Sequence, residues 1–430
     1  MKKTVMVLTS IGIALLPALA TQASAHGAQA VKRASGPKIN LTFSWWGNAT
    51  RDALTEKAIA YYEKLHPNIH ITPEFDGNFT DYFKKLTIEA ASGFMPDIVQ
   101  MDYDYISAFG DRGALLNLTP YHINTKNISQ SLLEDGVMGG KLYGIPNSIN
   151  AYALFYNPVL MKKAGIKVTP STRWTWSQFA AVVKKIHDKL GIYGTDDPED
   201  YQHFGYYVRQ TGKPLYSANQ KSVGYPAITL QNWFTYWNNL RNAKAIPDEA
   251  VTLSQQMGHS NDPFMAGKSA SIFYWANLWE SLPKMTNQPV AMMLPPTMPG
   301  GKEGMYLKPS QFWSIAENTK YPKQAAAFVD FLLNNLQANQ DMGTERGIPV
   351  SSVIRAAMEK TANATNKAEF AYFDKAAATA KTPLGTPPPV NNDEALAQAT
   401  NILQEVGYGQ LSPAQGAQQT VSQMNQILGN

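Results

Sequence analysis

The most constraining feature of this sequence is a regular alternation of extended and helical patterns near its amino-terminal end. Residues 39–46 alternate and are rich in β-branched and aromatic side chains, which predicts a strand. Pro67 and Gly93 each end a stretch with apolar residues at helical spacing. The predicted elements are a strand at 39–46, a helix at 51–66, a strand at 68–75, a helix at 79–92 and a strand at 96–101. This alternation predicts an α/β fold with a mostly parallel sheet covered by helices.

The rest of the chain adds elements of both kinds. Thr175 and Gln178 form a capping-box pattern at the start of a predicted helix that runs to Leu190, and Ser412 opens the final predicted helix. Further strands are predicted at 269–274, 290–294 and 311–315, and further helices at 159–164, 230–243 and 323–336. A chain of 430 residues is too long for one ordinary core, so we expect about two domains.

Composition and motifs argue against several classes of function. The chain has no cysteine, which excludes disulfides, zinc–thiolate sites, iron–sulfur clusters and attachment through a lipidated cysteine. The net charge is +4, and it falls to +2 when Lys2 and Lys3 leave with the first 25 residues, which is too little for a nucleic-acid-binding protein. The motifs of dinucleotide-binding proteins, phosphate-binding loops, zinc proteases and serine hydrolases are missing. We therefore expect no cofactor and no catalytic residues.

Two groups of acidic residues are the candidates for a cation site. Asp102 and Asp104 have the first spacing of a calcium-binding loop, but Ile106 stands at the next ligand position and Ser107 where the loop needs glycine. The acidic residues within 196–200 form either a loose cation site or a solvated surface loop. The sequence therefore predicts no metal site.

The amino-terminal residues have the pattern of a secretion signal. Lys2 and Lys3 precede an apolar stretch at 5–20, and the Ala-Ser-Ala at 23–25 fits the small-x-small cleavage rule. We predict that residues 1–25 are a signal peptide, with an uncleaved anchor as the alternative. No later stretch is apolar over the ~18 residues that a membrane span requires.

Aromatic and polar side chains follow the three amino-terminal strands. In chain order they are Trp46, Asn48, Asn78, Asp102, Tyr103 and Asp104. The carboxyl ends of the strands border the ligand site in many α/β sheets, and flat rings beside planar polar groups suit a sugar. Helix capping is the alternative role for Asn48, for Asn78 and for the two acids.

Six segments share the order and spacing of one known family. They are FSWWGN (43–48), PDIVQMDYDYISAFGDRGALLNLTPY (96–121), GKLYGIPNSINAYALFYN (140–157), PFMAGKSASIFYWAN (263–277), FVDFLL (328–333) and ERGIPVS (345–351). Together they resemble the extracellular solute-binding proteins of family 1, the maltose-binding-protein-like binding proteins of carbohydrate ABC importers. The resemblance implies a two-lobe periplasmic-binding-protein fold of type II (Venus-flytrap), with lobes joined by crossing hinge strands.

The resemblance also implies where the chain crosses between the lobes. Crossings are expected near Ser148, near Pro309 and at 348–352. The implied domains are a first lobe of residues 38–147 plus 310–349 and a second lobe of residues 148–309 plus 350–430.

A ligand site between the lobes is a further implication of the resemblance. Asp104 falls where the family often has a sugar-binding acid. Trp275 falls near a stacking aromatic and is the strongest single candidate, with helix packing as the alternative. Asn147 and Asn150 lie at the first crossing, where the alternative is turn chemistry after Pro146. The remaining candidates are Tyr206, Arg209, Asn277, Ser310 and Arg346, of which the two arginines have ion pairing as the alternative.

These expectations describe a soluble substrate-binding component of an ABC importer. It would capture a mono- or oligosaccharide by hinge closure and deliver it to the membrane permease subunits. The predicted signal peptide and the missing lipidation cysteine point to a periplasmic monomer. A periplasmic carbohydrate-active enzyme (hydrolase or lyase) and a binding protein for a non-sugar polar cargo stay open as alternatives. The mainly aromatic and amide candidate site favours a neutral polyol, whereas a uronic-acid sugar would raise the importance of Arg209 and Arg346.

Overall fold

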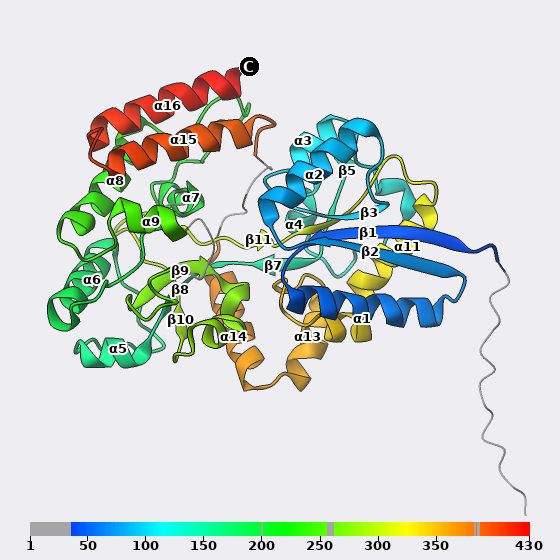
Figure 1. The fold of residues 1–430 in the computed structure, drawn as a ribbon, viewed down its shortest axis with the longest axis horizontal. Coiled ribbons are helices and arrows are strands. Elements are labelled where there is room, and N and C mark those ends of the chain that lie inside the picture. Colours follow the sequence, from blue (N-terminus) through cyan, green and yellow to red (C-terminus); the bar gives the residue numbers. More distant parts are fainter. Residues whose placement is uncertain (1–35, 199–200, 256–261, 382–383, 385–387) are drawn as a thin grey trace, which may run out of the picture.

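The computed structural model describes residues 36–198, 201–255, 262–381, 384 and 388–430. In these residues the chain forms two lobes, each with its own sheet and its own covering helices, and short strands lie between them (Figure 1). The predicted two-lobe α/β fold is therefore confirmed. The predicted signal peptide (1–25) lies outside the described residues, as do Glu199 and Asp200 of the acidic run.

The first lobe is built on a five-stranded sheet with the strand order β2-β1-β3-β12-β6. The strands are β1 (Ile39–Trp46), β2 (Ile69–Asp76), β3 (Ile98–Met101), β6 (Ile145–Pro146) and β12 (Phe312–Ile315). β1 pairs in parallel with β2 and β3, as the alternating pattern predicts. β12 is antiparallel to β3 and to β6, so the chain returns to complete this sheet after it has formed the strands of the second-lobe sheet.

Helices cover the first sheet on two sides. α2 and α3 lie on one side, and α1 and α11 lie on the other (Figure 1). The elements around this sheet are α1 (Ala49–Leu65), α2 (Phe79–Ser92), α3 (Ile106–Asp111), a 3-10 turn (Thr119–Tyr121), α4 (Gln130–Glu134), β4 (Val137–Met138), β5 (Lys141–Leu142), α11 (Pro322–Asn334) and α12 (Leu336–Met342). Trp45 is fully buried in one core cluster, whereas half-buried Trp46 packs against the other. The two tryptophans therefore point to opposite faces of β1, as strand alternation requires.

The second lobe is built on an antiparallel sheet with the order β10-β8-β9. Its strands are β8 (Tyr152–Tyr156), β9 (Ser271–Trp275) and β10 (Ala291–Met293). The remaining helices are α5 (Pro158–Lys163), α6 (Trp176–Leu190), α7 (Tyr201–Gln210), α8 (Ala227–Asn242), α9 (Glu249–Gln255), a 3-10 turn (Ala276–Trp279), α10 (Leu282–Thr286), α13 (Ser352–Thr361), α14 (Ala364–Thr379), α15 (Asn392–Gly407) and α16 (Pro413–Gly429). Trp233 and Trp237 of α8 are buried in the core of this lobe.

A small sheet joins the lobes. β7 (Ser148–Asn150) is antiparallel to β11 (Lys308–Pro309) and to β13 (Ile348–Pro349), so the three segments that the resemblance places at crossings pair with one another. Gly347, directly before β13, has a φ angle of 109°, and a Cβ there would lie 2.5 Å from the Ile149 carbonyl oxygen. A residue with a side chain would therefore force these strands apart. The residue boundaries of the two lobes stay a prediction.

The capping box at the start of α6 gives a local prediction about stability. Thr175 Oγ1 accepts a hydrogen bond from the Gln178 N–H (3.2 Å), and Gln178 Oε1 accepts one from the Thr175 N–H (2.9 Å). We expect Thr175→Ala to lower the free energy of unfolding by about 1 kcal/mol, and Thr175→Asn, which can still cap the helix, to leave it nearly unchanged. Urea unfolding followed by circular dichroism measures both values. Equal losses in the two variants would contradict the capping role.

Candidate functional site

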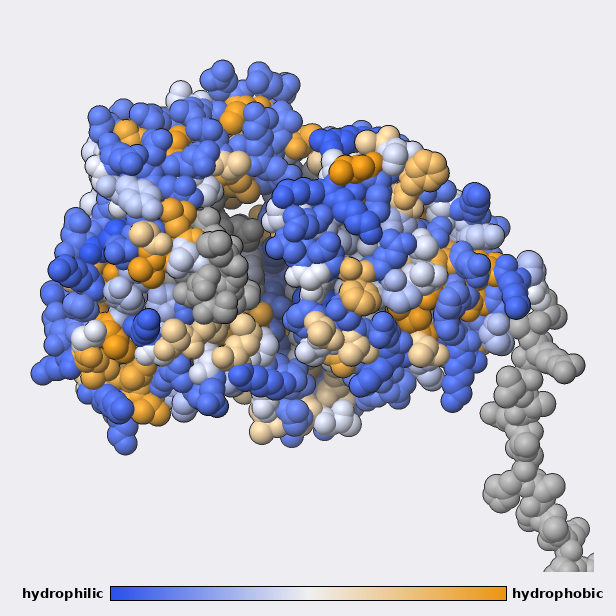
Figure 2. All heavy atoms as spheres, in the orientation of Figure 1, coloured by the Kyte–Doolittle hydropathy of each residue, from blue (hydrophilic) through white to orange (hydrophobic). Residues whose placement is uncertain are grey.

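A cavity of about 340 Å³ lies between the two lobes. Figure 2 shows the surface hollowed at this place. Its described lining residues are Tyr103, Asp104, Gly205, Arg209, Pro214, Leu215, Tyr216, Ser217, Ala218, Tyr306, Lys308, Leu384, Pro388, Asn392 and Leu396. Tyr103 and Asp104 directly follow β3 of the first lobe, whereas α7, the loop after it and α15 belong to the second lobe. A cavity with walls on both lobes changes shape when the lobes move relative to one another.

Three tyrosine rings make much of the cavity wall. Tyr103 and Tyr306 are buried, and Tyr216 is half-buried with its hydroxyl donating a hydrogen bond to Asn392 Oδ1. Burial raises the pKa of Tyr103 and of Tyr216 well above the ordinary value, so both phenols stay protonated at physiological pH. These groups offer apolar ring faces with neutral hydrogen-bonding rims, which is what the two surfaces of a sugar ring require.

Three charged side chains also line the cavity: Asp104, Arg209 and Lys308. The Arg209 guanidinium lies 5.0 Å from the centre of the Tyr306 ring, and its Nε donates to the Gly304 carbonyl (3.3 Å). Burial lowers the pKa of Arg209. Lys308 Nζ lies 4.5 Å from the Trp275 ring and 6.0 Å from the Tyr103 ring. Cations held over aromatic faces are stabilised by the ring quadrupole, and this interaction positions them.

The structure brings three of the predicted site residues together. Tyr103, Asp104 and Arg209 line the same cavity although they come from different lobes. The Asp104 N–H donates to Asp102 Oδ1 (3.0 Å), so Asp102 shapes the turn that carries the other two first-lobe residues. Asp102 itself is buried and is not among the described lining residues.

The Trp275 ring has a neighbour on each of its faces. Its ring stacks on Tyr152, its cross-strand partner, with ring centres 3.9 Å apart and planes 16° apart. Since this stacking fills one face, Lys308 Nζ lies over the opposite face. Trp275 is not among the described lining residues of the cavity, and its ring lies between Tyr152 and Lys308, so a stacking contact with a ligand stays a prediction.

Several other candidates serve the structure of the first lobe. Asn48 caps α1 by accepting from the N–H groups of Thr50 (2.9 Å) and Arg51 (3.0 Å), and Asn78 caps α2. Trp46 packs against the rings of Phe79, Tyr82 and Phe83. The capping alternative is therefore the one that the structure shows for both asparagines, and neither lines the cavity.

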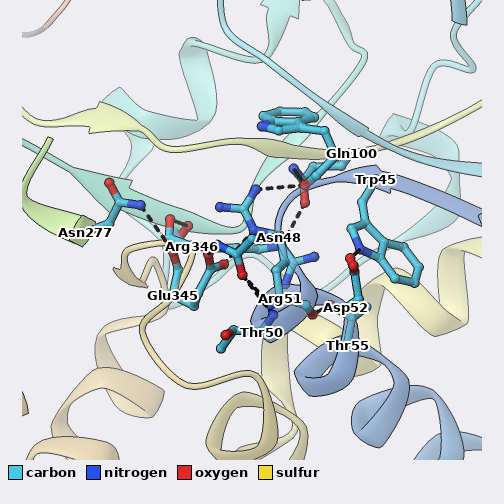
Figure 3. Close-up of polar contacts among 12 residues, drawn as sticks. Trp45, Asn48, Thr50, Arg51, Asp52, Thr55, Gln100, Asn277, Glu345 and Arg346 are labelled. Atoms are coloured by element: carbon cyan, nitrogen blue, oxygen red, sulfur yellow. Dashed lines mark hydrogen bonds and ion pairs between the residues drawn. The ribbon is translucent and has the colours of Figure 1, made fainter. Parts of the chain in front are cut away.

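The candidates at the crossings form hydrogen bonds with one another, and Figure 3 shows Asn277 pointing toward Glu345. Asn150 Nδ2 donates to Asn277 Oδ1 (2.7 Å), and Asn277 Nδ2 donates to the Glu345 carbonyl (3.1 Å). Ser148 Oγ donates to Asn147 Oδ1 (2.6 Å), while the buried Ser310 donates its N–H to the Ser148 carbonyl (2.9 Å). These hydrogen bonds connect the crossing segments, and the described lining of the cavity includes none of Asn147, Asn150, Asn277 and Ser310.

Arg346 is buried at the third crossing. Its Nε donates to Gln100 Oε1 (2.7 Å), and its guanidinium lies 5.4 Å from the Trp313 ring centre. Burial, and then the nearby Arg51, lower its pKa to about 9. The ion pair expected at this place belongs to the neighbouring residue, because Glu345 Oε2 pairs with Arg51 Nε at 2.5 Å (Figure 3).

Tyr206 is the last of the predicted contacts. Its hydroxyl donates to the carbonyls of Pro295 (3.3 Å) and Pro296 (3.0 Å), and the side chain is buried in the second lobe. It does not line the cavity, so the prediction of ligand contact is not supported. Its helix, α7, instead contributes Gly205 and Arg209 to the cavity wall.

Sequence reasoning missed five polar residues of the described lining: Tyr216, Ser217, Tyr306, Lys308 and Asn392. Tyr306 and Lys308 stand directly before the expected crossing at Pro309, and that position is the signal by which they could have been found. Tyr216 and Asn392 are far apart in the sequence and lie in no recognisable motif. Only folding shows that they share a wall.

Two further properties concern metals and membranes. In the described part of the chain, no group of three or more His, Asp and Glu side chains is arranged to hold a metal ion. Among the helices that the structure describes, none combines the length and the apolar character needed to cross a membrane.

Two α/β lobes with a shared cavity and a three-stranded connection define the class of two-lobe solute-binding proteins. The family model of bacterial extracellular solute-binding proteins matches residues 46–339, more than half of the chain. The chain belongs to this family.

Individual relatives agree with this assignment. An extracellular solute-binding protein of family 1 from Alicyclobacillus acidocaldarius has a similar structure, with a TM-score of 0.71 and 44% identity; the match covers 92% of this chain and 100% of that one. The maltodextrin-binding protein of Bacillus subtilis is 24% identical over 70% of this chain and 72% of its own length. A maltooligosaccharide ABC transporter solute-binding lipoprotein of Streptococcus pneumoniae is 25% identical over 64% of each chain. The names of the Bacillus and Streptococcus relatives give maltodextrin and maltooligosaccharides as what they bind, and the Streptococcus protein is named as part of an ABC transporter.

Proposed function

We propose that this protein captures an oligosaccharide in the cavity between its lobes and delivers it to the permease of an ABC importer. The observation that carries the proposal is a cavity to which both lobes contribute tyrosine rings and polar groups. The family and the oligosaccharide-binding relatives support the same kind of cargo and the same kind of partner. The volume of about 340 Å³ is of the size that small-ligand sites require.

Capture would proceed by hinge closure about the small sheet of β7, β11 and β13. The second lobe holds Tyr216, Tyr306 and Arg209, and the first lobe brings Tyr103 and Asp104 against the same guest. A ligand that contacts both walls favours the closed state, because the open state lacks one set of these contacts. The closed shape would then be the form that the permease recognises.

The proposed location is the periplasm, with the protein acting as a monomer. The predicted signal peptide would direct export. One relative is a lipoprotein, but this chain has no cysteine to carry a lipid anchor. We therefore propose that it diffuses freely to its permease.

Thermal unfolding of the purified protein with a panel of mono- and oligosaccharides tests the function. A ligand at millimolar concentration and micromolar affinity should raise the midpoint temperature by several degrees, because it binds only the folded state. Small-angle scattering with the same ligand should show a smaller radius of gyration. Chromatography should recover the saccharide intact, whereas cleavage products would indicate an enzyme. A midpoint and a scattering profile unchanged by every saccharide would overturn the proposal.

A further inference from the structure

We propose that Asn277 is a positioning residue for ligand capture. It acts through Glu345, and the hydrogen bond between them holds the two lobes in the arrangement that gives the cavity both of its walls. This inference rests on the proposed function. It adds a residue that controls the affinity for the saccharide without touching it.

The side chain of Glu345 is bound to the first lobe. Its Oε1 accepts a hydrogen bond from Asn48 Nδ2 (3.0 Å), and its Oε2 pairs with Arg51 Nε (2.5 Å). Both donors lie at the start of α1, directly after the first strand of that lobe. The Glu345 side chain is only 16% exposed, and hydrogen bonds to a carboxylate are stronger than those between neutral groups. Glu345 is therefore firmly fixed to the first lobe.

The backbone of Glu345 is bound to the second lobe. Its carbonyl oxygen accepts a hydrogen bond from Asn277 Nδ2 (3.1 Å). Asn277 lies in the 3-10 turn that directly follows β9, a strand of the second-lobe sheet. Figure 3 shows Asn277 on one side of Glu345, and Asn48 with Arg51 on the other. One residue is therefore joined to both lobes through different atoms.

Backbone N–H groups fix the direction in which the Asn277 amide points. Asn150 Oδ1 accepts from the N–H groups of Ala151 (3.0 Å) and Asn277 (3.2 Å). Its Nδ2 therefore faces Asn277 Oδ1, to which it donates (2.7 Å). Since the oxygen of the Asn277 amide is engaged by Asn150, the amide turns its NH₂ group toward the Glu345 carbonyl. The neighbouring backbone thus prepares the donor that joins the lobes.

This network lies beside the cavity but outside its described wall. Asn150 is the cross-strand partner of Lys308, which lines the cavity. The described lining includes none of Asn150, Asn277 and Glu345. We therefore expect the network to influence a ligand through the placement of the lobes, not by direct contact.

The strands of the connection leave the lobes room to rotate. β7 pairs with β11 over two residues and with β13 over two residues, and so short a ladder gives little resistance to twisting. A side-chain hydrogen bond that joins the lobes outside this ladder restricts the rotation. The network is present together with a cavity that has walls on both lobes, so it stabilises the arrangement that a ligand requires. Its loss lowers the fraction of protein in that arrangement, and the apparent affinity falls in proportion.

Distances between spin labels on the two lobes test this inference. Because the chain has no cysteine, Lys84→Cys on α2 and Ala397→Cys on α15 place one label on each lobe, both at exposed positions (Figure 1). Asn277→Asp keeps an oxygen for Asn150 and removes the donor to Glu345. In the ligand-free protein we expect this variant to show longer and more widely spread distances than the labelled protein with Asn277.

Calorimetry with maltotriose, xylotriose, arabinotriose and trigalacturonic acid measures the effect on affinity. We expect Asn277→Asp to weaken binding about 5-fold, the contribution of one hydrogen bond, and to the same extent for each saccharide that binds. A saturating concentration of that saccharide should restore the distances. Asn277→Ala removes the same donor without adding a charge, so it should weaken binding at least as much.

The matched control is Asn318→Asp. Asn318 Nδ2 donates to the Met95 carbonyl at 3.0 Å, and both residues belong to the first lobe. This variant removes the same kind of hydrogen bond within one lobe, so we expect it to change neither the distances nor the affinity.

The possible results separate the inference from the function. Unchanged ligand-free distances in both Asn277 variants overturn the inference, and weaker binding in that case assigns Asn277 to direct ligand contact. An effect of Asn277→Asp that Asn277→Ala does not share, or an equal effect of Asn318→Asp, also overturns it. All of these outcomes leave the proposed function intact. If the unchanged protein binds none of the saccharides, the proposed function fails, whereas the ligand-free distances still decide whether Asn277 sets the arrangement of the lobes.

Discussion

Replacing Arg51 with alanine is expected to lower the free energy of unfolding by about 3–5 kcal/mol, because it leaves a mostly buried carboxylate without its positively charged partner and with only the hydrogen bond from Asn48. Arg51 Nε pairs with Glu345 Oε2 at 2.5 Å, and Arg51 Nη1 donates to the Trp46 carbonyl (2.9 Å). The side chains of the pair are only 8% and 16% exposed. The pair links the start of α1 to the segment before β13, so its loss also loosens the third crossing. Urea unfolding measures the change.

The control for this prediction is an exposed ion pair. Lys184 and Asp188 lie one helical turn apart on α6, and their side chains are 56% and 52% exposed. We expect Lys184→Ala to change the free energy of unfolding by less than about 1 kcal/mol, since water screens such a pair. A loss of the same size in both variants would show that burial of Glu345 is not the cause.

Replacing Tyr216 with alanine is expected to weaken binding of the oligosaccharide about 30-fold, or about 2 kcal/mol, the size of a central binding residue. Among the three cavity tyrosines it is the one only half-buried, so its ring has more surface left for a ligand. Its hydroxyl group is held by Asn392 Oδ1, which fixes the ring against the wall. Calorimetry with the ligand found by the thermal screen measures the affinity.

Tyr216→Phe separates the ring from its hydroxyl group. This variant keeps the apolar face and removes only the hydrogen bond to Asn392, so we expect it to retain most of the affinity. Unchanged affinity in Tyr216→Ala would show that the ligand does not stack on this ring. Equal losses in the two variants would assign the effect to the hydroxyl group.

Local patterns predicted the elements of the fold well. The strand at 39–46 and the helix at 79–92 are found with those bounds, since alternation, capping and Gly93 are encoded within a few residues. The capping boxes at Thr175 and Ser412 are both present. Periodicity does not encode the antiparallel pairing of β12 with β3. The two strands are far apart in the sequence, and the strands of the second lobe lie between them in the chain.

The site was harder to predict because the same type of residue can either bind a ligand or stabilise the fold. Asparagine at a strand–helix junction suits a sugar hydroxyl and a helix cap equally, and capping prevails at Asn48 and Asn78. Trp275 ends a strand as expected. The register of the strands, however, places Tyr152 directly opposite, and the Tyr152 ring covers one face of the Trp275 ring. Three predicted residues do line the cavity: Tyr103 and Asp104 after β3, and Arg209 on α7. Its other walls come from segments that no local pattern connects.

The place of β12 has a consequence for the order in which the protein is made. Phe312 pairs with Met101, so the ribosome must synthesise all three strands of the second-lobe sheet before the first sheet gains its fourth strand. Until then one edge of β3 stays unpaired, and we expect the first lobe to gain its full stability only late in synthesis. A nascent chain that is held back from early compaction stays competent to thread through a narrow translocation channel, as the export route proposed for it requires.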